Sequence, residues 1–134
     1  MKKLFSTNYS AGAFNVAMLL LRLIPGLLMI NHGYGKLDHF SNMKNDFMNF
    51  LGLGSTFSLC LVIFAEVFCS LFLVLGLFTR LAAIPLIIDM AVAFFMAHNH
   101  DFYGKGEMAV LYLSVYLAIL IVGPGKISID NMIK

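Results

Sequence analysis

Four apolar segments, each close to the length that an α-helix needs to cross a lipid bilayer, occupy most of this chain. A crossing helix takes about 20 predominantly apolar residues. Only 12% of the 134 residues are charged, against about 25% in soluble domains, so a soluble fold would leave much apolar surface in water. The pattern predicts an all-α integral membrane protein, an antiparallel four-helix bundle in which residues 1–134 form one domain. The expected spans are residues 14–33, 56–78, 81–98 and 107–122.

The connection between the first two spans carries a helical pattern of its own. Its apolar side chains recur at helical spacing: Leu37, Phe40, Met43, Phe47, Phe50 and Leu51. Charged and polar residues fill much of the opposite face. This combination is typical of an amphipathic helix at the membrane surface, so we expect a short interfacial helix between helices 1 and 2.

The loops on one side of the expected bundle hold more Lys and Arg than those on the other. The side with both termini and the turn after the second span holds Lys2, Lys3, Arg80, Lys126 and Lys134. The opposite side holds Lys36, Lys44 and Lys105. Because Lys and Arg are enriched in cytoplasmic loops, this difference predicts that both termini lie in the cytoplasm.

Three ionisable residues, Arg22, Glu66 and Asp89, lie well inside the expected spans. Counted along each span at about 1.5 Å per residue, all three lie near the bilayer midplane. A charge at that depth costs about 2.5–3.5 kcal/mol, so three unpaired charges at one level would be a coincidence. We expect Arg22 to bridge the two carboxyl groups, one of which holds a proton. The alternative is a purely structural cluster that locks the helices together.

A second polar group gathers where the spans reach the non-cytoplasmic side. Its members are His32, Lys36, His98, His100 and Glu107. One stripe of the first span joins this group to the midplane at helical steps: Arg22, Gly26, Met29, Gly33 and Lys36. The two glycines of the stripe permit close approach of another helix or of a ligand. The spacings match no known metal motif, and ordinary interfacial polar residues are the alternative explanation.

Tyr112 and Tyr116 lie one helical turn apart on the expected fourth span. Packing explains such a pair, but a phenol hydroxyl also hydrogen-bonds ligand carbonyl groups. The candidates for ligand binding or proton handling are therefore Arg22, His32, Lys36, Glu66, Asp89, His98, Glu107 and Tyr112. No catalytic residue is assigned.

Short motifs, in order along nearly the whole chain, resemble those of the DoxX family. The matching segments are Arg22-Leu23, His32-Gly33-x-x-Lys36-Leu37, Ala65-Glu66, residues 75–83, residues 93–98, Glu107 and residues 123–130 (GPGKISID). Asp89 is not part of the resemblance. The resemblance implies a four-helix bundle in the bacterial cytoplasmic (inner) membrane, linked to membrane oxidoreductase complexes and to oxidative-stress defence.

Two functions from different classes fit these features. The first is a subunit of a membrane oxidoreductase system that binds a quinone- or lipid-like molecule, because an apolar cavity with a few convergent polar groups suits such a ligand. No haem, flavin or iron–sulfur motif is present, so we expect no covalent cofactor and electrons from a redox-enzyme partner or from a soluble reductant. The second is a non-catalytic scaffold in an oxidative-stress complex. Whether the chain is itself an enzyme stays open.

The expected partners follow from the same features. The lipid bilayer is the first, and a redox-enzyme partner protein and a homo-oligomer are further expectations. No basic stripe indicates nucleic acid, and no metal site is expected. A small transporter is less favoured, because four helices leave little room for alternating access without a dimer.

Overall fold

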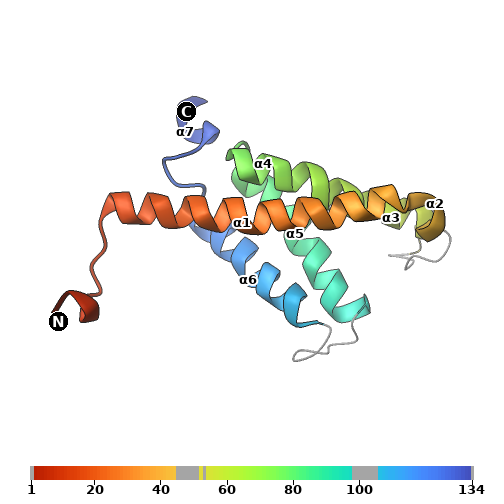
Figure 1. Cartoon of the computed structure of the whole chain (residues 1–134), viewed down its shortest axis with the longest axis horizontal. Helices are drawn as coiled ribbons and strands as arrows, with labels where there is room; N and C mark the ends of the chain where they lie inside the picture. The colour runs from red at the N-terminus through yellow and green to blue at the C-terminus, as the bar shows by residue number, and fades with distance from the viewer. Residues whose placement is uncertain (1, 45–51, 53, 98–105, 134) are drawn as a thin grey trace.

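The computed structural model describes residues 2–44, 52, 54–97 and 106–133, and every regular element among them is helical (Figure 1). In chain order the elements are η1 (Lys2–Phe5), α1 (Ala11–Asp38), α2 (Phe40–Met43), α3 (Ser55–Ile63), η2 (Phe64–Cys69), α4 (Ser70–Leu75), α5 (Thr79–Val92), η3 (Ala93–Ala97), α6 (Glu107–Val122) and α7 (Ile129–Ile133). Two of them, η2 and η3, are π-helical turns that continue α3 and α5. The all-helical class predicted from the sequence is confirmed.

The longest helix, α1, begins after Ser10, whose hydroxyl accepts a hydrogen bond from Ala13 N at 3.0 Å. This contact satisfies one of the amides that the first helical turn leaves free. The buried residues of α1 form one stripe at steps of three and four: Met18, Arg22, Gly26, Met29 and Gly33. The face that the sequence predicts to point inward is therefore the buried face of the helix.

The rod formed by α3, η2 and α4 packs closely along α1. A Cβ atom on Gly26 would lie 2.6 Å from Val74 Cγ2, and one on Gly33 would lie 2.6 Å from Val67 Cγ2. Both distances are shorter than non-bonded carbon atoms tolerate, so these glycines allow the two helices to approach each other. The rod ends at Gly76, whose left-handed conformation (φ +73°) is common at helix ends.

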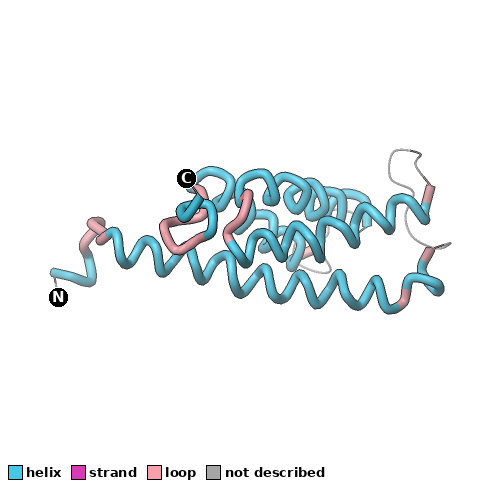
Figure 2. Tube along the Cα trace, turned by 90° about the horizontal axis from the view of Figure 1, so that it is seen from above, coloured by secondary structure: helices cyan, strands magenta, loops and turns pink. Residues whose placement is uncertain are grey.

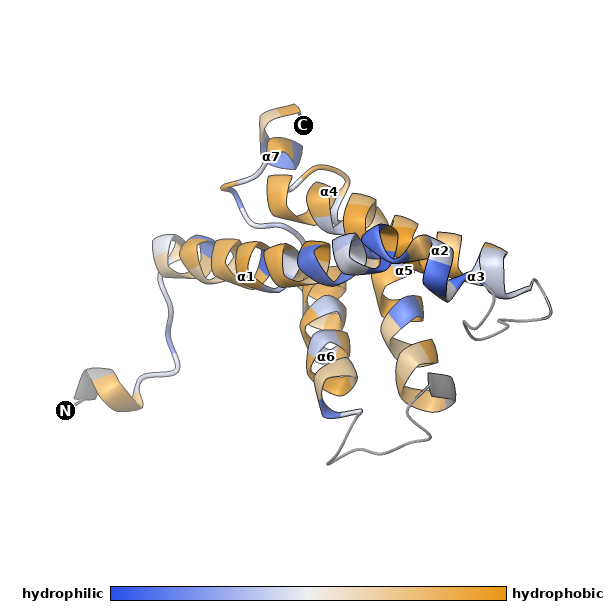
Figure 3. Cartoon of the chain, turned by 45° about the vertical axis from the view of Figure 1, so that its right-hand side comes forward, coloured by the Kyte–Doolittle hydropathy of each residue, from blue (hydrophilic) through white to orange (hydrophobic). Residues whose placement is uncertain are grey.

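The other two long helices, α5 and α6, pack side by side and run obliquely to α1 (Figure 1; Figure 3). Seen from above, the N-terminal part of α1 extends beyond the remaining helices (Figure 2). The short α7 lies beside the end of α4 (Figure 1), where Asp130 N donates a hydrogen bond to Gly76 O at 2.8 Å. The tail therefore folds back onto the turn between α4 and α5.

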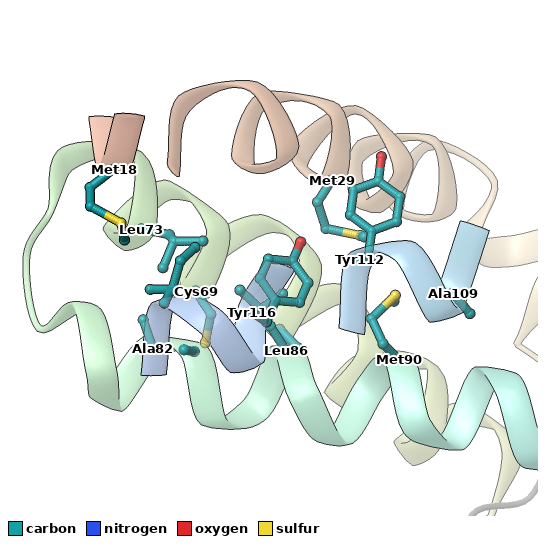
Figure 4. Close-up of a cluster of buried hydrophobic side chains, with 13 residues drawn as sticks. Met18, Met29, Cys69, Leu73, Ala82, Leu86, Met90, Ala109, Tyr112 and Tyr116 are labelled. Carbon is teal, nitrogen blue, oxygen red and sulfur yellow. The ribbon is translucent and has the colours of Figure 1, made fainter. Parts of the chain in front are cut away.

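The interior combines small side chains, methionines and two tyrosines (Figure 4). Its buried apolar members are Met18, Met29, Ala65, Cys69, Leu73, Ala82, Ala83, Leu86, Met90, Ala109, Tyr112, Tyr116 and Ile119. Large apolar side chains also cover the outside, and on α1 these include Leu20, Ile24, Leu27 and Leu28. Such a surface suits lipid tails rather than water.

Two helical stretches are long and apolar enough to cross a membrane, Ala11–Asp38 and Ser55–Leu75. A third apolar helix, Glu107–Val122, is shorter and coincides with the predicted fourth span.

The first helix differs from the expected span of residues 14–33, because α1 continues to Asp38. Hydropathy marks where apolar residues stop, but the polar turns after residue 30 remain helical, with Gly33 packed against the neighbouring rod and Lys36 paired with Glu66 of that rod. Leu37 therefore belongs to α1, and the predicted start of an interfacial helix at this residue is wrong. Within the described part of the connection, α2 is a separate short helix. Residues 45–51 and 53, which carry the rest of the predicted interfacial helix, lie outside the described residues.

Candidate functional site

The charged side chains that are buried or partly buried among the described residues include two groups. We call Lys36, Glu66 and Asp89 the ion-pair cluster. Near the tail, Arg22 and Asp130 are the charged members of a second group, which we call the tail clasp. The sequence predicts one central cluster around Arg22, so this division is itself a correction.

The close packing of α1 against η2 places Glu66 within reach of Lys36. A Cβ atom on Gly33 would lie 2.8 Å from Glu66 Cβ and 3.1 Å from its carbonyl carbon, so only glycine lets the η2 backbone come this near. Three residues further along α1, Lys36 Nζ lies 2.6 Å from Glu66 Oε1. The Glu66 side chain is 3% exposed and that of Lys36 is 25% exposed. The carboxylate is thus buried, while the ammonium lies at the edge.

The second carboxyl group of the cluster comes from α5, where Asp89 lies near enough to Glu66 for the two groups to interact electrostatically. Two neighbouring buried carboxyl groups repel each other when both are ionised, which favours a proton on one of them. Together with Lys36, the pair then has no net charge, which is the arrangement that a low-dielectric interior favours. The other oxygen of Asp89, Oδ2, is buried without a hydrogen-bond partner among the described residues. Glu66 and Asp89 thus interact with each other, but Arg22 does not bridge them as the sequence predicts.

A cavity of about 140 Å³ lies beside the ion-pair cluster. It is lined by Met29, His32, Lys36, Glu66, Met90, Ala93, Met108, Ala109 and Tyr112. The rings of His32 and Tyr112 meet edge to face at a centroid distance of 6.2 Å. Figure 4 shows Tyr112 beside Met29, with the tyrosine ring reaching from α6 toward α1. The Tyr112 hydroxyl is buried and has no hydrogen-bond partner in the part of the chain that the structure describes.

The predicted pairing of Arg22 with Glu66 or Asp89 is wrong. Arg22 is 1% exposed, and its guanidinium group donates hydrogen bonds to Leu73 O at 3.5 Å and to Ile127 O. Arg22 precedes Lys36 by fourteen residues on the same helix, or roughly 21 Å along its axis. The depth count failed because α1 continues to Asp38, so that Lys36, and not Arg22, lies level with Glu66.

The tail clasp joins the turn before α5 to the end of the chain. The Asp130 carboxylate accepts hydrogen bonds from Phe78 N at 2.7 Å and from Thr79 N at 2.9 Å. Burial raises the pKa of Asp130, but the hydrogen bonds from Thr79 and Phe78 and the positive charge of Arg22 outweigh it, so the pKa lies below its ordinary value. The clasp therefore binds the ionised form of this carboxylate.

The structure brings His32, Lys36, Glu66 and Tyr112 together at one cavity, with Asp89 directly behind Glu66. Arg22 lies in the tail clasp, and Glu107 is exposed at the first position of α6. His98 lies outside the described residues. The functional roles proposed for these eight residues remain predictions.

Sequence reasoning gave no role to Met90 and Met108, which line the cavity, or to Asp130. The methionines carry no polar signal, since unbranched apolar side chains look alike wherever they are buried. Asp130 belongs to the GPGKISID segment, but its partners lie 51 and 52 residues earlier, so no local motif identifies its role.

Comparison with known proteins gives a family and two curated relatives. The DoxX family model matches residues 17–99, more than half of the chain. An uncharacterised protein of Haemophilus influenzae is 32% identical over 120 residues, which covers 83% of this chain and 86% of the relative. An uncharacterised membrane protein of Mycobacterium tuberculosis is 27% identical over 133 residues, covering 88% of this chain and 82% of the relative. No solved structure matches the chain significantly.

Proposed function

The chain belongs to the DoxX family of membrane proteins, and we propose that it binds the ring of a quinone-like molecule beside the ion-pair cluster, as a subunit of a membrane oxidoreductase system. In this proposal the chain crosses the bacterial cytoplasmic membrane four times with both termini inside. The third and fourth spans would be α5 with η3, and α6. Exposed apolar side chains on these helices, such as Ile88, Leu111 and Ile121, support the assignment.

The observation that carries the proposal is a buried phenol hydroxyl without a partner on the wall of a cavity. Burying a hydroxyl group without a hydrogen bond costs roughly 1–3 kcal/mol, so the Tyr112 hydroxyl would gain from a ligand acceptor. The cavity of about 140 Å³ is similar in size to an engineered apolar cavity of about 150 Å³ that holds a benzene molecule. The space therefore suits one six-membered ring, whose isoprenoid tail would extend into the bilayer.

The polar groups on the cavity wall are the ones that a quinone ring requires. A quinone carbonyl oxygen accepts hydrogen bonds, and Tyr112, His32 and Lys36 carry groups able to donate them. Reduction of a quinone to a quinol consumes two electrons and two protons. A proton held by one of the two carboxyl groups, Glu66 and Asp89, would be one source for the ring oxygen, and the second proton would come from water through Lys36, whose side chain is partly exposed.

The electrons must come from elsewhere, because the sequence carries no haem, flavin or iron–sulfur motif. In the proposed function a redox-enzyme partner reduces the bound quinone, while this chain holds the ring and handles protons. The chain would then contribute to an oxidoreductase without being a complete one.

The proposal is tested by titrating a short-tailed ubiquinone or menaquinone analogue into the purified protein and measuring its dissociation constant. Tyr112→Phe removes one hydroxyl and should weaken binding about fivefold, the value of one net hydrogen bond of about 1 kcal/mol. Tyr116→Phe is the matched control, because it makes the same change one turn along α6 and Tyr116 does not line the cavity.

Equal binding by the two variants, or no binding by the parent protein, would refute the assignment of the cavity. Native mass spectrometry of the protein as extracted from membranes distinguishes quinone binding from the scaffold alternative. A co-purified quinone supports the proposed site. A stoichiometric partner protein without any quinone supports a scaffold instead.

A further inference from the structure

Two cavities at the tail end of the molecule adjoin each other and do not share any residue with the proposed quinone site. The larger, of about 540 Å³, is lined by residues 78–81, residues 124–126, Asp130 and Asn131. The smaller, of about 240 Å³, is lined by Phe64, Cys69, Phe72, Phe78, Leu81, Ala82, Ile84 and Pro85. Phe78 and Leu81 line both, so the two cavities adjoin each other at the start of α5.

The larger cavity has two cationic side chains on its wall, Arg80 and Lys126. The guanidinium group of Arg80 donates hydrogen bonds to Val122 O at 3.2 Å and to Ile121 O at 3.5 Å. A Cβ atom on Gly123 would lie 3.1 Å from Arg80 Nη2, so the guanidinium lies directly against this glycine. These contacts involve one of its terminal nitrogens and hold the group in a fixed position, where its remaining N–H groups are available to an anion.

The second cation of this cavity is held through its main chain, because Lys126 N donates a hydrogen bond to Asn15 Oδ1 at 3.0 Å. The cavity also contains one carboxylate, Asp130, which already accepts hydrogen bonds from Phe78 N and Thr79 N. Its negative charge is further offset by Arg22 on the opposite side. The balance of charges on the wall therefore favours an anion.

The smaller cavity is lined by aromatic and aliphatic side chains, with a cysteine as the least apolar member. It lies between α5 and the rod formed by α3, η2 and α4, and it reaches the turn at Phe78. A cationic pocket at the end of the helices and an apolar groove beginning at the same residues form an amphipathic pair. Phospholipids have this distribution of charge and apolar surface, with an anionic phosphate followed by acyl chains.

We propose that the two cavities form one binding site for an anionic phospholipid. Its phosphate lies between Arg80 and Lys126, where the planar guanidinium is suited to two parallel hydrogen bonds with phosphate oxygens. The first part of one acyl chain lies in the groove beside Phe78 and Leu81. This site is independent of the quinone-binding proposal.

The test titrates the full-length purified protein, in a neutral detergent, with phosphatidylglycerol or with phosphatidylcholine of identical acyl chains. Native mass spectrometry measures the fraction of protein that carries one lipid. The parent protein should prefer the anionic lipid, and Lys126→Gln should reduce this preference about fivefold. Lys44→Gln makes the same change of charge away from the two cavities and should leave the preference unaltered.

A second pair of measurements keeps the result independent of protein stability. Arg80→Lys retains the charge but not the planar donor arrangement, and it should also weaken the preference. Glycerol phosphate, which has the anionic group without acyl chains, should not displace the lipid at equal concentration. Equal affinity for both lipids, an equal loss in Lys44→Gln, or displacement by glycerol phosphate would each overturn the proposal. The last result would indicate a site for small anions instead.

Discussion

Arg22 and Lys36 are two cations on the same side of α1, and the molecule neutralises them in different ways. Arg22 is 1% exposed, and main-chain carbonyl groups of Leu73 and Ile127 surround it. Lys36 remains partly exposed, forms an ion pair with a buried carboxylate and lines a cavity. An enclosed cation with fixed main-chain partners stabilises a structure. A partly open ion pair beside a buried hydroxyl without a partner retains the capacity to respond to a ligand.

The largest expected effect concerns the enclosed cation. Arg22→Met removes the donor to two main-chain carbonyl groups and the charge opposite Asp130, so we expect the free energy of unfolding to fall by about 3–5 kcal/mol. Addition of Glu66→Gln and Asp89→Asn should not restore it, because these carboxyl groups are not the partners of Arg22. Denaturation in sodium dodecyl sulfate would measure all three free energies, and recovery in the triple variant would show that Arg22 pairs with the carboxyl groups after all.

The ion pair of Lys36 and Glu66 should differ from Arg22 in that a second substitution restores stability. Lys36→Met leaves Glu66 buried without its cation, and we expect a loss of about 2–3 kcal/mol, below the value for a fully buried pair because water reaches Lys36. In this case Lys36→Met with Glu66→Gln should recover most of the stability, since no charge is then stranded. The same denaturation measurement provides the comparison. A double variant as unstable as the single one would show that Lys36 has a different role.

The next largest effect on stability concerns the close packing of α1 against η2. A Cβ atom on Gly33 would meet Glu66 Cβ at 2.8 Å, whereas one on Gly35 would meet nothing within 4 Å. Gly33→Ala should therefore destabilise the protein by about 1–3 kcal/mol through overpacking. Gly35→Ala should be neutral or slightly stabilising, because alanine favours helix. Equal thermal stability of the two variants would contradict the close packing at Gly33.

The smallest effect belongs to the tail clasp and depends on pH. Asp130→Ala removes an acceptor from the first turn of α5 and should cost about 1 kcal/mol at neutral pH, and Asp130→Asn should cost less. Because the pKa of Asp130 is lowered in the folded protein, its charge stabilises the fold fully above the ordinary carboxyl pKa, and this contribution disappears as the pH falls through the lowered value. The thermal stabilities of the parent protein and Asp130→Asn should therefore converge as the pH falls through the lowered pKa of Asp130. A constant difference across pH would exclude the charge as the cause.

Much of the helical arrangement could be predicted from the sequence because apolar periodicity is a local property. The stripe of α1 and the limits of α6 were predictable for this reason. The proximity of Glu66 and Asp89 was predictable because two carboxyl groups buried at the same depth require a shared cation or a bound proton. The identity of the cation could not be predicted, because it depends on how far α1 continues beyond its apolar residues.

The tail clasp marks the limit of sequence reasoning more clearly. Asp130 stands in a short polar segment that follows α6, and no neighbouring residue in the sequence indicates its partners. Its role depends on a turn that precedes it by some fifty residues. Contacts of this kind depend on the tertiary fold, so they become visible only when the helices are placed in space.

The late position of Ile127 has a consequence for biosynthesis. The ribosome completes α1 long before it reaches the residues that enclose Arg22, because both Ile127 and Asp130 belong to the last part of the chain. During synthesis the arginine therefore lacks two of its partners until Ile127 and Asp130 have been added. Chains that stop at Lys126 would leave the guanidinium group without these two partners, and pulse-chase measurements should find them degraded faster than chains that include both residues. The enclosure of one guanidinium group thus depends on residues that are synthesised long after the helix that carries it.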